Sequence, residues 1–270
     1  MKKLIIIFFF LLSNVFALEK VSLQLLWLDQ FQFAGYYMAK EKGFYNDVGL
    51  DVQINEYSNK FVKKVNIVDD VISGTSTYGI GRSSLISERS KGKSVVALAS
   101  IFQSSPLILL GLESEDKKSM KDLKNKRIML TNSTTGTTAI EAMLVSNGVH
   151  LVSENIQNHS FNLDDLINKK TDLMASYISN EPYILEQKGI KYKIFSPKQE
   201  GYDFYSDILY TSKNEIQLHP KRTENFLNAS LKGWEYAFDN KEEAVEFTKK
   251  YITSEQYKDD EYNKFILEKS

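Results

Sequence analysis

Residues 23–45 read LQLLWLDQFQFAGYYMAKEKGFY, a pattern typical of a strand, a turn and a helix in succession. The apolar residues from Leu23 to Leu26 predict a short buried strand. The helix that follows has an apolar face and stops at Gly43, with the apolar Phe44 directly beyond it. Ligands of open α/β sheets bind beyond the carboxyl ends of strands, so the turn is a predicted binding position.

Three residues of this turn, Trp27, Asp29 and Phe31, are candidate ligand contacts. A carboxylate surrounded by aromatic side chains needs a polar partner, because burying an unpaired charge is costly. We therefore expect Asp29 to accept hydrogen bonds from a ligand beside the two rings. The aromatic residues could equally belong to the core, and the sequence leaves both interpretations open.

The first residues have the three parts of a secretory signal peptide. Residues 1–3 are basic, residues 4–12 form an uninterrupted apolar run, and Val15 and Ala17 suit the signal peptidase. The apolar run is far shorter than the roughly 20 residues that span a bilayer. We predict a signal peptide at 1–17, cleavage after Ala17 and export to the periplasm.

Composition excludes several kinds of chemistry. The 270-residue chain has no cysteine, which excludes disulfide bonds, thiolate ligands and the lipidated cysteine that anchors many exported binding proteins. The three histidines, at positions 150, 159 and 219, show no metal-ligand spacing. The formal net charge is −1, or −3 without the two signal-peptide lysines (−1 − 2 = −3), which gives no basic footprint for nucleic acid. We expect no metal, no cofactor and no nucleic-acid partner.

Strand and helix patterns alternate from Leu18 to about Thr211, which predicts an α/β protein with parallel sheets. Further helices are expected at 65–73, 220–239 and 241–252. The residues at core spacing in the last two helices are expected to pack inside the protein.

Two segments interrupt this alternation and predict crossovers between lobes. Residues 103–105 follow a buried strand, and residues 201–207 lead into a later one. We therefore predict a first lobe of residues 18–101 plus 206–270 and a second lobe of residues 102–205. A ligand cleft is expected between the two lobes.

The most polar loop, TNSTTGTT at 131–138, precedes a predicted helix that runs to Asn147. A hydroxyl-rich helix start that contains glycine presents free amide N–H groups and the positive end of the helix dipole. The loop could bind an anion or a polar ligand edge, or it could simply cap the helix. No Walker lysine follows, which excludes a nucleoside-triphosphate loop. The candidate ligand contacts are Thr134, Thr135, Gly136 and Thr137.

A predicted strand at 172–179 delivers Tyr177 and leads into Asn180-Glu181-Pro182. Proline favours the first turn of a helix, so Asn180 and Glu181 are expected at a helix start beyond a strand end. The Glu181 carboxylate could complement the helix dipole there, or it could accept hydrogen bonds from a ligand. The sequence leaves both roles open.

Several ordered segments resemble the type II periplasmic binding proteins that bind thiamine pyrimidine precursors. The similarity runs from about Val21 to Ala244. It implies two α/β lobes joined by two crossover strands, with the ligand cleft between them. The segments are WLDQFQFAGYYMAKEKGFY, SGTSTYGIGRSSL, FQSSPLILL, ISNEPYILEQKGI, YDFYSDILYTS and HPKRTENFLNASLKGWEYAF.

The resemblance implies ligand contacts at strand ends and at the crossovers. An aminopyrimidine offers a flat face to Trp27, Phe31 or Tyr205, and its exocyclic amine can donate to a carboxylate. Asp29 and Glu181 are the expected acceptors. The positions that correspond to the family's cleft are Trp27, Asp29, Arg82, Ser83, Gln103, Ser104, Thr134 to Thr137, and Asn180 to Pro182.

We expect an exported, monomeric solute-binding protein that delivers an aminopyrimidine-like solute to an ABC transporter permease. A ligand-sensing domain of a signalling receptor is one alternative, and it requires a chain that continues past Ser270 into a transmembrane helix. An enzyme is the other alternative, because the same branch contains the yeast-type pyrimidine synthase, which consumes its own pyridoxal phosphate. The synthase's cysteine-rich motif is absent from this sequence.

Overall fold

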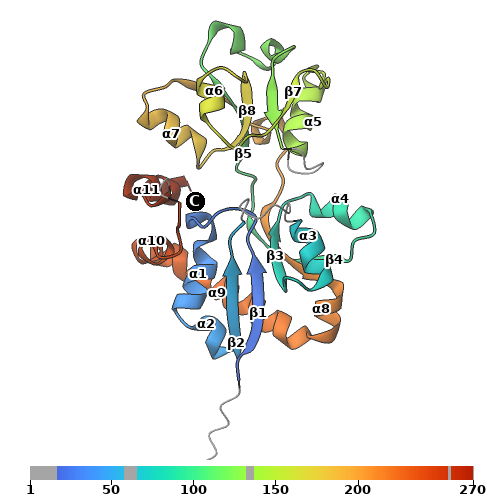
Figure 1. Ribbon diagram of the computed structural model, residues 1–270, viewed down its shortest axis with the longest axis vertical. Helices are drawn as coiled ribbons and strands as arrows, with labels where there is room; N and C mark the ends of the chain where they lie inside the picture. Colours follow the sequence, from blue (N-terminus) through green and yellow to red (C-terminus); the bar gives the residue numbers. More distant parts are fainter. Residues whose placement is uncertain (1–16, 58–65, 132–136, 255–256, 270) are drawn as a thin grey trace, which may run out of the picture.

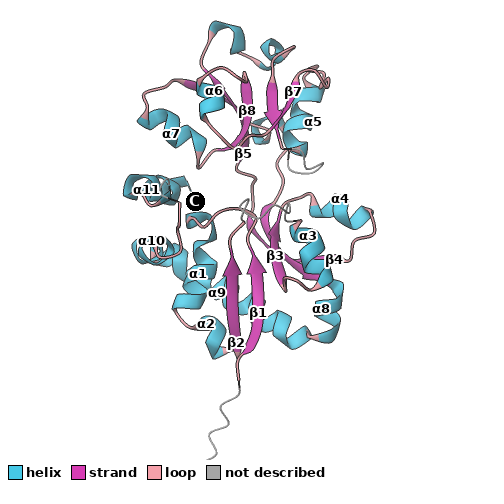
Figure 2. Ribbon diagram, viewed as in Figure 1, coloured by secondary structure: helices cyan, strands magenta, loops and turns pink. Residues whose placement is uncertain are grey.

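The computed structural model describes residues 17–57, 66–131, 137–254 and 257–269, in which ten strands form two five-stranded sheets (Figures 1 and 2). The first sheet has the order β2-β1-β3-β10-β4 and the second β7-β6-β8-β5-β9. The strands of the first sheet are β1 (Glu19–Gln24), β2 (Leu50–Asn55), β3 (Tyr78–Gly81), β4 (Val95–Phe102) and β10 (Ser206–Ser212). Those of the second are β5 (Leu107–Leu112), β6 (Ile128–Leu130), β7 (Ile156–Asn158), β8 (Leu173–Tyr177) and β9 (Tyr192–Phe195).

The first sheet is packed between two groups of helices. One face packs Leu23 and Tyr78 against Phe226, whose ring stacks on that of Tyr78 with centroids 3.7 Å apart. The opposite face packs Tyr210 against Leu85. The helices around this sheet are α1 (Ala34–Glu41), α2 (Phe44–Asp47), α3 (Ile67–Ser73), α4 (Leu85–Ser90), α8 (Lys213–Leu218) and α9 (Pro220–Asp239).

The second sheet also has a core on each face. Leu109 packs with Ile140 of α5 on one face, and Met174 packs with Leu185 of α7 on the other. The helices around this sheet are α5 (Thr138–Ser146), α6 (Asp164–Ile167) and α7 (Glu181–Gln187). Short 3-10 turns occur at η1 (Phe31–Phe33), η2 (Glu115–Lys117), η3 (Met120–Leu123) and η4 (Lys198–Glu200).

The prediction of parallel sheets is wrong for one strand of each sheet. β10 runs antiparallel to β3 and β4, and β5 runs antiparallel to β8 and β9. β5 follows β4 of the first sheet in the chain, and β10 follows β9 of the second sheet. Each of the two strands therefore begins at the edge where the two sheets face one another. As a result β1, β3, β6 and β8 all end at that edge.

The two connections between the sheets are joined by one carboxylate. Asp203, which precedes β10, accepts hydrogen bonds from Ser104 Oγ at 2.8 Å and from Ser105 N at 3.2 Å. Both donors lie between β4 and β5. The two sheets are therefore linked by a pair of short segments that are tied to one another. The lobe limits predicted from the sequence, 18–101 plus 206–270 for the first lobe and 102–205 for the second, remain a prediction.

The C-terminal part of the chain returns to the gap between the sheets. Figure 1 shows α11 (Asp260–Lys269) between α7 above and α10 (Lys241–Lys249) below. Tyr262 and Ile266 of α11 are buried with Phe31 and Met38 of the first sheet's helical layer. Within the described ranges, no helix is both long enough and apolar enough to cross a membrane.

Candidate ligand-binding site

A cavity of about 120 Å³ lies where the strand ends of the two sheets face one another. A buried water needs roughly 10–15 Å³ by the same measure, so the space suits a ligand of on the order of ten non-hydrogen atoms. Trp27 and Arg82, which follow β1 and β3, line one side. Thr131 and Tyr177, at the ends of β6 and β8, line the other.

The structure brings together six of the fifteen residues predicted from the sequence. They come from both sheets, and α7 begins at Glu181 with Asn180 as its N-cap, as predicted. The six are Trp27, Arg82, Thr137, Tyr177, Asn180 and Glu181.

Three other predicted residues of the first sheet lie elsewhere. The Asp29 carboxylate accepts a hydrogen bond of 2.5 Å from Tyr37 Oη instead of lining the cavity. The pKa of Asp29 is raised to about 6, mainly by burial and also by neighbouring Glu56, while the Tyr37 hydrogen bond opposes the rise. Phe31 is a core residue beneath α11. Ser83 uses its carbonyl oxygen to accept from the amide of Ile86 in the first turn of α4.

The predicted contacts at the crossovers also lie away from the cavity. Gln103 Nε2 donates to the Ser100 carbonyl at 2.8 Å, and Ser104 is bonded to Asp203. Tyr205 is 57% exposed. Gln103 and Ser104 belong to the connection between β4 and β5, and Tyr205 directly precedes β10. Three further predicted contacts, Thr134, Thr135 and Gly136, lie outside the described residues.

Trp27 is the centre of an aromatic cluster at the cavity. Its ring lies parallel to that of Tyr57, with centroids 6.4 Å apart, and meets Phe161 of the second sheet's layer at 5.1 Å. Its Nε1–H donates to Tyr257 Oη at 3.3 Å. Trp27 therefore contacts residues from both sheets and from the C-terminal segment.

Phe161 and His159, which were not predicted from the sequence, line the cavity opposite Trp27. The His159 ring stacks on Phe161 at 4.4 Å, and its Nδ1 accepts from the Phe161 amide at 2.9 Å. Nε2 lies 2.6 Å from the Ala175 carbonyl, so Nε2 carries the proton and the ring is neutral. Burial lowers the pKa of His159. Phe161 has a positive φ of 56°, a strained conformation for a bulky residue, and such strain is common at ligand sites.

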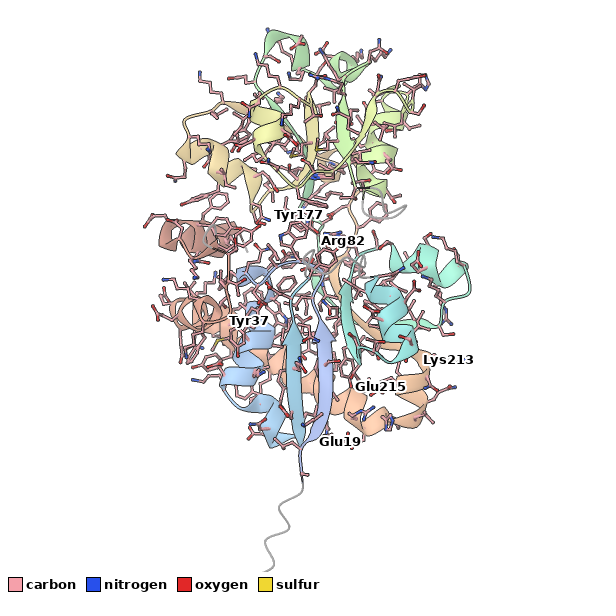
Figure 3. All side chains as sticks on the ribbon, in the orientation of Figure 1. Glu19, Tyr37, Arg82, Tyr177, Lys213 and Glu215 are labelled. Atoms are coloured by element: carbon pink, nitrogen blue, oxygen red, sulfur yellow. The ribbon has the colours of Figure 1, made fainter. Side chains whose placement is uncertain are left out.

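Arg82 and Tyr177 connect the two sheets at the floor of the cavity. Figure 3 labels the pair at the level where the sheets meet, and Arg82 Nε donates to Tyr177 Oη at 2.6 Å. Arg82 follows β3 of the first sheet and Tyr177 ends β8 of the second, so this hydrogen bond forms only when the two sheets lie close together. The pair therefore marks a closed arrangement of the cleft.

A row of buried polar side chains, Gln30, Gln32 and Asp207, reaches the cavity at Gln32. Gln30 Nε2 donates to Gln32 Oε1 at 2.9 Å, and Gln32 Nε2 donates to Asp207 Oδ2 at 2.6 Å. Burial raises the pKa of Asp207 to about 6, although the Gln32 hydrogen bond and the Arg82 charge oppose this. The Asp207 carboxylate is therefore ionised above neutral pH and can only accept hydrogen bonds there.

Glu181 lies at the start of α7, where its carboxylate is bonded to the backbone and also borders the cavity. Its Oε2 accepts from the Tyr177 amide at 2.9 Å, at the first turn of α7, and the side chain also lines the cavity. Burial raises the pKa of Glu181 to about 7, although the backbone amides of Tyr177 and of Glu181 itself oppose this. The carboxyl group is thus held in place by the backbone while facing the ligand space. No group of three or more metal-ligating side chains occurs within the described ranges.

Residues 30–244 match the sequence profile of the family described as NMT1/THI5 like. The chain belongs to the NMT1/THI5 like family. Two proteins similar in sequence to this chain are named for a ligand. The riboflavin-binding protein of Chloroflexus aurantiacus is 22% identical over 263 residues, which covers 94% of this chain and 72% of that protein. The formylaminopyrimidine-binding protein of Halalkalibacterium halodurans is 25% identical over 236 residues, which covers 85% of this chain and 69% of that protein.

A solved structure of another protein has the same fold as this chain. The periplasmic aliphatic sulphonate binding protein of Escherichia coli superimposes with a TM-score of 0.67 at 12% identity, covering 93% of this chain and 78% of that one. The NMT1/THI5 like chain therefore has the periplasmic binding protein fold, and the resemblance noted in its sequence is confirmed.

Proposed function

We propose that the protein is a solute-binding protein for a small, flat heterocycle with N–H donors, of the aminopyrimidine type. One observation carries the proposal: the Glu181 carboxyl group and the Trp27 ring meet in one cavity of about 120 Å³ between two sheets. The carboxylate suits an exocyclic amine, and the ring suits a flat face. The formylaminopyrimidine-binding relative is named for a ligand of this kind.

Size favours a pyrimidine over a flavin as the ligand. A space for on the order of ten non-hydrogen atoms matches a single substituted ring. Riboflavin, for which another relative is named, has three fused rings and a sugar-alcohol chain. The volume of about 120 Å³ therefore favours the smaller ligand.

The lining favours binding over catalysis. Among the described residues that line the cavity there is no lysine, so no side-chain amine is available there to hold pyridoxal phosphate as a Schiff base. We propose that residues 1–17 export the protein to the periplasm and that a membrane permease of an ABC importer receives the solute. Closure of two lobes around the solute is the shape change that such a permease can recognise.

A thermal-shift panel tests the proposed function. The panel contains formyl- and hydroxymethyl-aminopyrimidine, thiamine, riboflavin, taurine, an alkanesulfonate and nitrate. At about a hundred times Kd, linkage adds roughly 2.7 kcal/mol to the free energy of unfolding, so an aminopyrimidine should raise Tm by about 5–10 °C. Recovery of the bound compound with unchanged mass distinguishes binding from turnover. A panel in which both aminopyrimidines leave Tm unchanged rejects the proposed ligand class.

A further inference from the structure

Tyr262, on the C-terminal helix α11, touches two amide side chains at once. Its hydroxyl is 2.6 Å from Asn180 Oδ1 and 3.1 Å from Gln30 Oε1, and all three residues are buried. A tyrosine hydroxyl has one proton, so it cannot donate to two oxygens. One of the two amides must therefore present its NH2 group to Tyr262.

The row of Gln30, Gln32 and Asp207 decides which amide this is. The Asp207 carboxylate accepts from Gln32 Nε2, which turns Gln32 Oε1 towards Gln30. Gln30 must then donate from Nε2, so Gln30 Oε1 is the atom that faces Tyr262. The Tyr262 proton goes to Gln30, and the Tyr262 oxygen is left to accept from Asn180.

Because the Tyr262 oxygen accepts a hydrogen bond, the Asn180 amide must direct its Nδ2 towards Tyr262. The oxygen and nitrogen of a side-chain amide have nearly the same size, so this orientation fits the same space. Within the described part of the chain, the other end of the Asn180 amide has no hydrogen-bond partner, and Asn180 lines the cavity. That end is Oδ1.

We propose that Tyr262 is a positioning residue that holds the Asn180 amide with its oxygen towards the ligand. The cavity then presents two neighbouring acceptors, Asn180 Oδ1 and the Glu181 carboxylate, on one helix start. Such a pair selects a ligand edge that carries two N–H donors and rejects an edge that carries an acceptor. This selectivity rests on the proposed function, whereas the orientation of the amide does not.

The orientation is measured without any ligand, by NMR of the full-length protein at pH 8. The Asn180 side-chain NH2 signal is identified by its loss in Asn180→Asp. We expect slow solvent exchange of one of its protons in the wild type and fast exchange in Tyr262→Phe, which removes only the hydroxyl. Tyr183→Phe is the matched control, because it removes a 3.0 Å hydrogen bond to Asp259 between the same two segments and leaves Asn180 untouched.

Fast exchange of the Asn180 NH2 group in the wild type, or equal protection in Tyr262→Phe, overturns the proposal. So does loss of protection in the Tyr183→Phe control, since loosening of α11 would then explain the result. These outcomes hold whether or not a pyrimidine binds.

Selectivity is measured by calorimetry with two probes that differ at one edge. They are 4-amino-2-methylpyrimidine, which has N–H donors, and 4-methoxy-2-methylpyrimidine, which has none. We expect the wild type and Tyr183→Phe to prefer the amine by about tenfold or more, and Tyr262→Phe to lose most of that preference. An unchanged preference in Tyr262→Phe contradicts the role in selectivity. Wild-type protein that binds neither probe rejects the proposed function and the selectivity with it, while the amide orientation is still decided by NMR.

Discussion

Glu181 is the residue on which ligand affinity should depend most. Its pKa of about 7 means that the carboxyl group is half protonated near neutral pH, and only the ionised form presents acceptors alone to a ligand N–H group. A ligand that binds the ionised form should bind about tenfold more tightly at pH 8 than at pH 6. Titration calorimetry across this range measures the effect.

Glu181→Gln is the matched variant for that titration. It keeps an oxygen for the Tyr177 amide but places an NH2 group towards the ligand, so affinity at pH 8 should fall about ten- to a hundredfold. The same variant removes the titrating group, so any pH dependence that remains belongs to the ligand itself. If Glu181→Gln keeps the wild-type affinity, the carboxylate only caps α7.

Trp27 should contribute through stacking. Stacking of a base on an aromatic ring is worth roughly 1–3 kcal/mol by alanine substitution, so Trp27→Ala should weaken aminopyrimidine binding about five- to a hundredfold. Tyr205→Ala is the control, since Tyr205 is an exposed aromatic residue away from the cavity. Calorimetry on both variants compares them, and equal affinities would mean that the ring of Trp27 is only structural.

At the scale of single residues, the sequence predicted those cavity-lining residues that lie at or shortly after strand ends. Trp27, Arg82, Tyr177 and Glu181 come within a few positions of a strand end, and strand ends can be read from apolar runs. Tyr257 could not be predicted in this way, because it reaches Trp27 across 230 positions of sequence.

Asp29 and Phe31 show the opposite failure among the predicted contacts. Both are close in sequence to Trp27, yet one bonds to Tyr37 and the other packs beneath α11. The direction of a side chain in a turn depends on tertiary contacts, which the local sequence does not specify.

At the scale of elements, the packing of α1 on α9 supports the first side of the cleft. An added Cβ at Gly233 of α9 would overlap the carbonyl oxygen of Gly35 in α1. Gly233→Ala should therefore lower the free energy of unfolding by about 1–3 kcal/mol, because a tightly packed contact cannot take the extra carbon. Chemical denaturation of the variant measures this loss.

Asn228→Ala is the control for the same helix, because Asn228 is exposed on α9. Its unfolding free energy should stay within about 0.5 kcal/mol of the wild type. Ligand affinity should survive in both variants where they are folded. A neutral Gly233→Ala would mean that α1 and α9 are farther apart than the structure shows.

The positions of helices and strands could be predicted better from the sequence than the direction of each strand in its sheet. The helix stop at Gly43 is confirmed, with a positive φ of 75° at that residue, and the long helix predicted at 220–239 matches α9. The antiparallel β5 and β10 were missed, because a strand's apolar pattern is the same in either direction. Only the three-dimensional connection between the sheets fixes the direction.

At the scale of the whole molecule, two acids with raised pKa values should make the ligand-free protein less stable as pH rises. Asp207 and Glu181 have pKa values of about 6 and 7, raised from 3.8 and 4.5. Between about pH 4 and pH 7 the folded state binds more protons than the unfolded state, so the free energy of unfolding falls as pH increases. Each group contributes on the order of 3 kcal/mol, at 1.36 kcal/mol per pKa unit.

Denaturant unfolding of the empty protein at pH 5 and pH 8 tests this, with higher stability expected at pH 5. Asp207→Asn keeps an acceptor for Gln32 while removing the charge, so it should reduce the difference between the two pH values. Equal stability at both pH values, or a maximum at pH 8, would contradict the burial of these charges.

A crystal structure of the complex with formylaminopyrimidine would show whether one flat solute with N–H donors lies between the two sheets. We expect the ring in the cavity against Trp27, with its exocyclic amine about 3 Å from the Glu181 carboxylate and a second N–H group on Asn180 Oδ1. An empty cavity at saturating ligand, or a ligand bound away from these residues, would contradict it.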